Sequence, residues 1–139
     1  MGVGMAASLV KAGFHVWGYD VYEPSIQKFV VAGGKARAAI SPAEAARGAE
    51  ILVLMVQTAA QADDVLFGTG AAAKALPHGS VVILNSTVSP SAVRDLSTRL
   101  SILGNKLELI DAPVSRGVAR AAKAELTVIR PQTSCEIHY

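Results

Sequence analysis

Short runs of apolar residues alternate along the chain with longer segments that have helical spacing. The clearest run covers residues 51–56, all of them apolar, and predicts a central strand that is buried on both faces. Other strand-like runs lie at residues 14–19, 80–84, 107–110 and 126–129. Strands that alternate with helices are typical of βαβ units. The pattern therefore predicts an α/β fold built on a parallel sheet, with a loop at residues 112–117.

Helix boundary signals support this alternation. Residues 2–12 are small or aliphatic and are followed by Gly13, which is typical of a helix end. A second helix is expected over residues 24–31. Ser41 and Glu44 have the spacing of a capping box, so a third helix is expected to begin there. Further helices are expected over residues 61–67, over residues 71–76 and in a segment that begins at Ser89.

Composition narrows the class of protein. Hydrophobic residues make up 51% of the chain and the mean hydropathy is +0.38, yet no apolar run approaches the roughly 20 residues of a membrane-spanning helix. The formal charge is only +2, and no cluster of lysine and arginine is interleaved with aromatic residues. Neither a membrane nor a nucleic acid is therefore an expected partner.

Candidate metal, disulfide and targeting signals are weak. His15, His78 and His138 lack metal-ligand spacing, so no metal site is expected. Cys135 has no second cysteine to pair with, which fits a reducing compartment. Residues 1–10 lack the pattern of a secretory signal. A cytoplasmic location is expected, and import into an organelle stays open because a longer chain could carry a transit peptide.

The start of the chain carries part of a phosphate-binding signature. Dinucleotide-binding folds open with a strand, a G-x-G-x-x-G turn and a helix whose N-terminus faces the pyrophosphate. Gly2 fits the last glycine of that signature, and Asp20 follows 18 residues later at a strand end, where an acid binds the adenosine ribose. The first strand and the first two glycines would then precede Met1. An ordinary helix followed by an ordinary strand-end aspartate explains these two residues equally well.

Two later segments are more specific. Residues 86–90 read Ser-Thr-Val-Ser-Pro, and residues 111–117 read Asp-Ala-Pro-Val-Ser-Arg-Gly. Together with Gly-Val-Gly-Met-Ala at 2–6 and Gly-Tyr-Asp-Val at 18–21, the series resembles the β-hydroxyacid dehydrogenase family. That family includes 3-hydroxyisobutyrate, tartronate semialdehyde, 6-phosphogluconate and threonate dehydrogenases.

The resemblance implies a Rossmann-type, doubly wound parallel sheet that binds NAD(P) over residues 1–130. The first strand of that sheet and the helical C-terminal domain of the family are absent from the sequence, and residues 131–139 form a polar tail outside the family pattern. The first strand lies in the middle of such a sheet. Its absence is expected to leave two central strands with open apolar edges and to lower the solubility of the chain.

The resemblance also assigns cofactor-binding residues. Gly2 and Met5 are expected beside the pyrophosphate, Asp20 on the adenosine ribose hydroxyls, and Thr87 near the nicotinamide ribose. Members that prefer NADP resemble Asn-Arg where this chain has Asp20 and Val21. A carboxylate at that place would repel a 2′-phosphate. NAD is therefore favoured over NADP.

The loop after residues 51–56 departs from the family pattern. The family reads Met-Leu-Pro there, with an asparagine four residues beyond the proline position. This chain has Val56 and Gln57 in the loop and Gln61 at the asparagine position. All three are still expected at the cofactor, with the backbone contact retained and the side-chain contact of Gln61 left open.

The substrate loop of the family reads Asp-Ala-Pro-Val-Ser-Gly-Gly and holds the substrate carboxylate. Ser115 and Gly117 match it, whereas Arg116 replaces the first glycine. Arginine can attract an anion but cannot adopt a glycine-only backbone, so Arg116 is either a substrate contact or a surface residue. The catalytic lysine of the family lies further along its sequence. Lys123 falls too early to replace it and is expected to be a solvated lysine on a helix.

The sequence thus predicts part of an NAD(P)-dependent dehydrogenase that moves hydride between the nicotinamide and a small β-hydroxyacid. The threonate-type branch fits best, and a homo-oligomer is expected only for the full-length enzyme. Without the catalytic lysine the isolated chain is expected to be inactive. Two alternatives stay open: a non-catalytic nucleotide-binding or interaction module, and an artefact of the gene model or of splicing.

Overall fold

The structure is a computed structural model that describes residues 1–115, 117–121 and 123–129. Arg116 and the tail 131–139, with Cys135 and His138, lie outside the described residues. The helices are α1 (Gly2–Lys11), α2 (Glu23–Val30), α3 (Pro42–Ala46), α4 (Ala59–Phe67), α5 (Ala72–Ala75), α6 (Pro90–Ile102) and α7 (Gly117–Ala121). The strands are β1 (Val16–Gly18), β2 (Ala36–Ala38), β3 (Ile51–Leu54), β4 (Val81–Leu84), β5 (Glu108–Asp111), β6 (Val114–Ser115) and β7 (Thr127–Val128).

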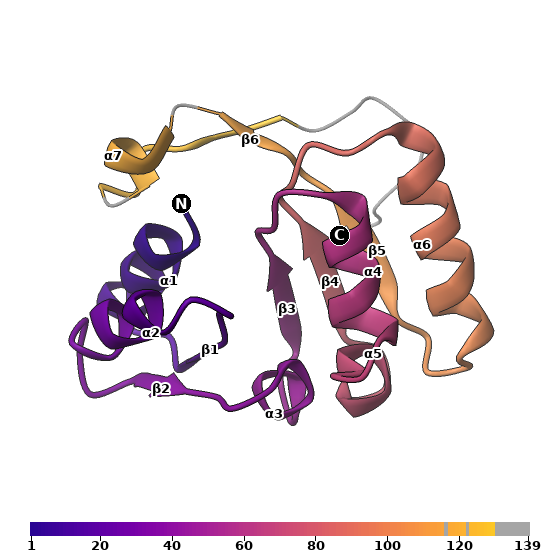
Figure 1. The fold of residues 1–139 in the computed structure, drawn as a ribbon, viewed down its shortest axis with the longest axis horizontal. Coiled ribbons are helices and arrows are strands. Elements are labelled where there is room, and N and C mark those ends of the chain that lie inside the picture. The colour runs from indigo at the N-terminus through magenta and orange to yellow at the C-terminus, as the bar shows by residue number, and fades with distance from the viewer. Residues whose placement is uncertain (116, 122, 130–139) are drawn as a thin grey trace.

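Most strands pair in parallel, in two separate groups. One group is a sheet with the order β3-β4-β5, and the other is the pair β1-β2. Figure 1 shows the pair standing apart from the sheet, with β1 and β3 as the edges nearest to each other. Helices alternate with these strands along the chain, which confirms the predicted α/β class with parallel strands. β6 and β7 form a small antiparallel pair.

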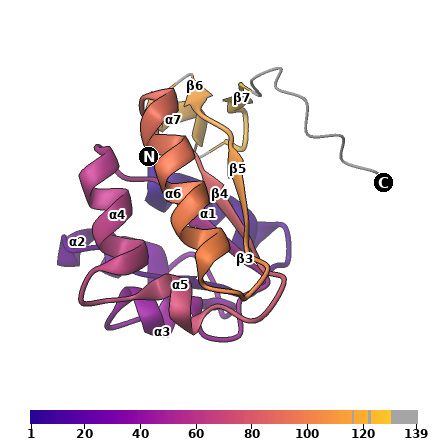
Figure 2. The same cartoon turned by 90° about the vertical axis from the view of Figure 1, so that its right-hand side faces the viewer.

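The main core lies between the β3-β4-β5 sheet and the helices that cover one of its faces. Because β4 is paired on both sides, its Val82 and Leu84 are fully buried. They belong to one apolar cluster with Leu66 of α4 and Leu100 of α6. Figure 2 shows α4 to the left of the sheet, with α6 between α4 and β5. A second, smaller cluster joins α1, α2 and β2 and consists of Val10, Phe29 and Ala36.

β3 is less buried than its apolar sequence predicts. Ile51 is 56% exposed and Val53 is 38% exposed, whereas Leu54 is buried. The predicted burial on both faces is therefore wrong for Ile51 and Val53. The physical reason is that β3 pairs only with β4 within the described residues, so its other edge has no neighbouring strand to cover it.

Three short elements differ from the hydrophobic pattern. β2 reads Ala-Arg-Ala, which has low strand propensity, and it forms through its parallel pairing with β1. The segment 112–117, expected as a loop, contains β6, and α7 begins at its last residue. These pieces depend on tertiary pairing, which local periodicity does not encode.

The predicted start of α3 is confirmed with one difference in detail. The Ser41 hydroxyl accepts a hydrogen bond from the Glu44 N–H at 3.1 Å, as expected for a cap. The Glu44 carboxylate accepts the N–H of Ile40 at 2.6 Å, one residue before the cap. Over the described part of the chain, no helix has the length and apolar character needed to cross a membrane.

Candidate dinucleotide site

The residues assigned to the cofactor follow the carboxyl ends of parallel strands. Asp20 comes after β1, Val56 after β3 and Thr87 after β4. In open parallel sheets, ligands bind beyond these carboxyl ends. The topology therefore gathers side chains from distant parts of the sequence at the edge where a ligand is expected.

The N-terminus of α1 lies next to the carboxyl end of β3. A Cβ atom added at Gly2 would lie 3.8 Å from the Cβ of Met55, the residue that follows β3. The carbonyl of Met1 accepts the N–H groups of Gly4 and Met5 at 3.1 and 3.3 Å, and no side chain caps the helix within the described residues. A first turn without a side-chain cap presents N–H donors and the positive end of the helix dipole, which suits an anion.

Asp20 is held in a defined turn after β1. Its Oδ1 accepts a hydrogen bond from the backbone N–H of Tyr22 at 2.9 Å, and the residue is exposed. This local turn orients the carboxylate. An ionised carboxylate has acceptor capacity on both oxygens, so Oδ2 can accept further hydrogen bonds from the hydroxyls of a ligand.

Hydrogen bonds to Ser86 and Gln61 hold the loop after β3 in place. The N–H of Val56 donates to the Ser86 hydroxyl at 2.9 Å, and the N–H of Gln57 donates to Oε1 of Gln61 at 2.8 Å. Gln61 also completes a capping box with Thr58 at the start of α4. The side chain of Gln61 therefore holds the loop in its conformation. These hydrogen bonds use the N–H groups of Val56 and Gln57, so their carbonyl oxygens can still accept hydrogen bonds from a ligand.

Two buried polar residues tie the ends of the three parallel strands together. The N–H of Asn85 donates to the Leu54 carbonyl at 2.9 Å, and its Nδ2 donates to the Ala112 carbonyl at 2.5 Å. Ser86 is also buried and accepts the hydrogen bond from Val56. This network fixes the segment that leads to the exposed Thr87. Asn85 was not predicted from the sequence, although an asparagine directly after an apolar strand indicates a side chain that can link neighbouring strands by hydrogen bonds.

The substrate loop begins where β5 ends. Burial raises the pKa of Asp111, the last residue of β5, above its usual range. Ser115 is half-buried in β6 and pairs with Thr127 of β7. Gly117 has φ +74°, a conformation that favours glycine. The match of Gly117 to the family glycine therefore has a backbone reason in this structure.

Lys123 and Asp63 lie outside the set of residues assigned to the cofactor. Lys123 is exposed in a turn after α7. Asp63 forms an ion pair with Arg99, whose guanidinium lies 4.0 Å from the centre of the Phe67 ring.

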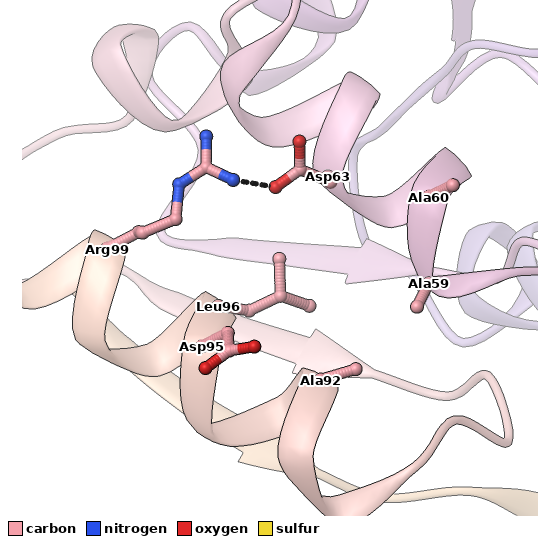
Figure 3. Close-up of a pocket in the computed structure, with 7 residues that line it drawn as sticks. All are labelled: Ala59, Ala60, Asp63, Ala92, Asp95, Leu96 and Arg99. Carbon is pink, nitrogen blue, oxygen red and sulfur yellow. Dashed lines mark hydrogen bonds and ion pairs between the residues drawn. The ribbon is translucent and has the colours of Figure 1, made fainter.

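Asp63 and Arg99 line a hollow of about 260 Å³ between α4 and α6. Figure 3 shows the ion pair together with the other side chains that line the hollow. The hollow is lined by Ala59, Ala60, Asp63, Ala92, Asp95, Leu96 and Arg99. None of the residues assigned to the cofactor lines it.

A protein-family model described as the NAD binding domain of 6-phosphogluconate dehydrogenase matches residues 1–132. The chain belongs to this family. The match confirms the resemblance drawn from the motifs.

Relatives and solved structures agree with this assignment. The chain is 42% identical to the L-threonate dehydrogenase of Cupriavidus necator over 93% of its length, and this match covers 42% of that protein. It is 35% identical to the mitochondrial 3-hydroxyisobutyrate dehydrogenase of Mus musculus, covering 91% of the chain and 37% of that protein. The crystal structure of a 3-hydroxyisobutyrate dehydrogenase from Salmonella typhimurium has a TM-score of 0.81 at 35% identity, with 91% of this chain and 43% of that chain covered.

The chain thus spans less than half the length of the relatives that it matches. It corresponds to the NAD-binding domain of hydroxyacid dehydrogenases.

Proposed function

We propose that this chain binds NAD through the carboxyl edge of its parallel strands, as the cofactor-binding part of a hydroxyacid dehydrogenase. The observation that carries the proposal is the turn at Asp20, where Tyr22 orients the carboxylate and leaves Oδ2 as an acceptor. An acid at the end of this strand suits the two adenosine ribose hydroxyls. The same negative charge opposes a 2′-phosphate, which favours NAD over NADP.

The remaining cofactor contacts follow from the same edge. Gly2 is the first residue of α1, where its N–H group and the positive end of the helix dipole favour an anion such as the pyrophosphate, and Met5 is assigned to the same end of the helix. The carbonyls of Val56 and Gln57 can accept hydrogen bonds from the cofactor, while Gln61 holds that loop in shape. Thr87 is assigned to the nicotinamide ribose. When bound, NAD supplies the hydride acceptor.

For a longer enzyme with this domain, we propose the oxidation of a small hydroxyacid. Ser115 and the backbone around Gly117 are assigned to the substrate carboxylate, since a hydroxyl and N–H groups are suitable donors to an anion. The L-threonate dehydrogenases match at 35–42% identity and the mitochondrial 3-hydroxyisobutyrate dehydrogenases at 32–35%, which favours the threonate type. Among the residues that the structure describes, none is assigned as the general acid or base for the hydroxyl proton, so we expect the isolated chain to lack dehydrogenase activity.

Isothermal titration calorimetry of the 139-residue chain with NAD and with NADP tests the proposal. We expect measurable binding of NAD and weaker binding of NADP. Replacement of Asp20 by alanine should remove this difference. An absence of heat with NAD at millimolar concentration, on a chain whose amide spectrum shows that it is folded, would refute the proposal.

A further inference from the structure

Residues 112–115 leave the end of β5 and form the loop that is assigned to the substrate carboxylate. The register of the β4-β5 pair ends at Leu84 and Asp111. Beyond this point the chain turns away from the sheet, and Figure 1 shows β6 leading from the sheet toward α7. The position of Ser115 therefore depends on the contacts that hold this loop to the end of β4.

The backbone of this loop has few hydrogen-bond donors. Pro113 has no N–H group, so the donors on either side of it belong to Ala112 and Val114. The N–H of Ala112 donates to the Leu84 carbonyl at 2.9 Å, and the N–H of Val114 donates to the Asn85 carbonyl at 3.4 Å. Both acceptors lie at the end of β4 or directly after it, so this end of β4 holds the loop.

The side chain of Asn85 takes the place of the next bond between β4 and β5. In a parallel pair, a residue that donates to one carbonyl of its neighbour accepts from the N–H two residues further along. Because Ala112 donates to Leu84, a continued ladder would bring the N–H of Ser86 to the Ala112 carbonyl. That carbonyl instead accepts a hydrogen bond from Nδ2 of Asn85 at 2.5 Å. The reach of a side chain thus keeps the loop attached where it diverges from β4.

Burial makes this hydrogen bond hard to replace. Asn85 and Ala112 are each 6% exposed. Among the residues that the structure describes, no backbone N–H donates to the Ala112 carbonyl. Loss of the amide would leave a buried carbonyl without a donor, which is unfavourable. The loop would then be expected to move until the carbonyl reaches water.

The cofactor side of the site is held by other groups. The backbone N–H of Asn85 donates to the Leu54 carbonyl at 2.9 Å, and the Ser86 hydroxyl accepts the N–H of Val56 at 2.9 Å. Neither bond uses the amide of the Asn85 side chain. A change confined to that amide should therefore affect the substrate loop and spare the loop after β3.

We infer that Asn85 is a positioning residue for the substrate, because its side-chain amide holds Ala112 and so sets the place of Ser115 relative to Thr87. This inference rests on the proposed function, which assigns Ser115 to the substrate carboxylate and Thr87 to the nicotinamide ribose. Asn85 lies two residues before Thr87, and Ala112 lies three residues before Ser115. Only a short length of chain therefore separates the hydrogen bond from each of the two assigned residues.

Asn85→Asp tests the inference because it keeps the shape of the side chain and removes the donor. An ionised carboxylate only accepts hydrogen bonds, so it would face the Ala112 carbonyl without a proton. Amide exchange measured by NMR on the 139-residue chain should show protection factors of Ala112 and Val114 that fall by at least about tenfold. The protection factor of Val82, in the centre of β4, should stay as in wild type.

Binding measurements separate positioning of the substrate from general support of the site. Titration of the NAD-saturated chain with L-threonate, followed at the Ser115 amide, should give about tenfold weaker binding in Asn85→Asp. The dissociation constant of NAD should remain that of wild type, since the bonds to Leu54 and Val56 persist. A variant that merely weakened the whole edge would lose affinity for both ligands.

The Asn85→Asp variant can also be rescued by acid. A protonated carboxyl group has an O–H donor, so lowering the pH through the pKa of the new carboxyl should restore the protection of Ala112 and Val114. Wild type is measured over the same pH range, because Asp111 is also ionisable. Asn85→Leu has a side chain of similar size that cannot donate at any pH, and it should stay unprotected throughout.

Asn105→Asp is the matched control. It makes the same change beyond the opposite, amino end of β5, where the Asn105 carbonyl accepts the N–H of Gly79 at 2.8 Å. It should leave the protection of the substrate loop and both dissociation constants unchanged. If Asn85→Asp does not fold, Asn85→Leu carries the same comparison with Asn105→Asp and wild type.

Two results would overturn the inference alone. The first is unchanged protection of Ala112 and Val114 in folded Asn85→Asp and Asn85→Leu. The second is a wild-type chain that binds both ligands while Asn85→Asp binds L-threonate equally well or loses NAD affinity to the same extent. If wild type binds no NAD or no L-threonate, the proposed function is wrong. The protection factors then decide the part of Asn85: a loss confined to residues 112–114 supports the hold on the loop, and a loss that extends to Val82 contradicts it.

Discussion

Replacement of Asp20 by asparagine separates the charge of this residue from its shape. Asparagine keeps an oxygen that can accept the Tyr22 N–H at 2.9 Å, so the turn after β1 should persist. Only the negative charge is lost. Any change in cofactor choice can then be assigned to electrostatics.

The expected magnitude follows from the exposure of Asp20, which puts the interaction at the high-dielectric limit. Two unit charges about 4 Å apart then interact by about 1 kcal/mol, and a phosphate monoester carries nearly two charges. Loss of the carboxylate charge should therefore strengthen NADP binding by about 2 kcal/mol, or about 30-fold. NAD should bind about fivefold more weakly, because hydrogen bonds to a charged acceptor exceed those to a neutral one by about 1 kcal/mol.

Calorimetric titration of wild type and Asp20→Asn with both cofactors measures this change. The ratio of the NADP and NAD dissociation constants should fall by about 150-fold in the variant. Glu108→Gln removes the same charge at the amino end of β5 and serves as the control, with an unchanged ratio expected. An equal ratio in wild type and Asp20→Asn would refute the role given to this carboxylate.

Three further predictions concern the scaffold. Leu100→Ala should lower the free energy of unfolding by about 2–5 kcal/mol in urea titrations because Leu100 is fully buried, whereas Ile102→Ala, at an exposed site, should change it by less than about 0.5 kcal/mol. Gln61→Ala should cost about 0.5–2 kcal/mol through loss of the cap and of the bond to Gln57, and Gln61→Glu, which keeps the acceptor, should recover most of it. Burial raises the pKa of Asp111, so ionisation of this carboxyl lowers stability as pH rises through its folded pKa. Asp111→Asn should therefore be more stable than wild type at neutral pH, and this advantage should vanish below the unfolded pKa; an advantage that grows on acidification would contradict it.

Much of the architecture could be predicted from the sequence because apolar runs and helix caps are local features. The apolar runs that form β3 and β4 and the cap at Ser41 can be identified without tertiary information. β2 was missed because Ala-Arg-Ala becomes a strand only through its pairing with β1. The exposure of Ile51 was misjudged because an apolar sequence does not reveal whether a neighbouring strand is present.

The site could be predicted less completely than the fold. Asp20 was predicted from its spacing to Gly2 and Thr87 from the family resemblance, and each follows the carboxyl end of a parallel strand. The sequence left the role of the Gln61 side chain open, because the hydrogen bond that it accepts from the N–H of Gln57 is visible only in the structure. Asn85 was not predicted because its partner, the Ala112 carbonyl, is distant in sequence and lies close only after β5 has paired with β4.

The central claim is that NAD binds along the carboxyl edge of the parallel strands. Amide chemical-shift mapping of the chain during titration with NAD tests it most directly. The account predicts that the largest shifts fall on residues 2–5, on residues 20–22, on Val56 and Gln57, and on Thr87. Shifts confined to the hollow between α4 and α6, around Ala60 and Ala92, would contradict the account.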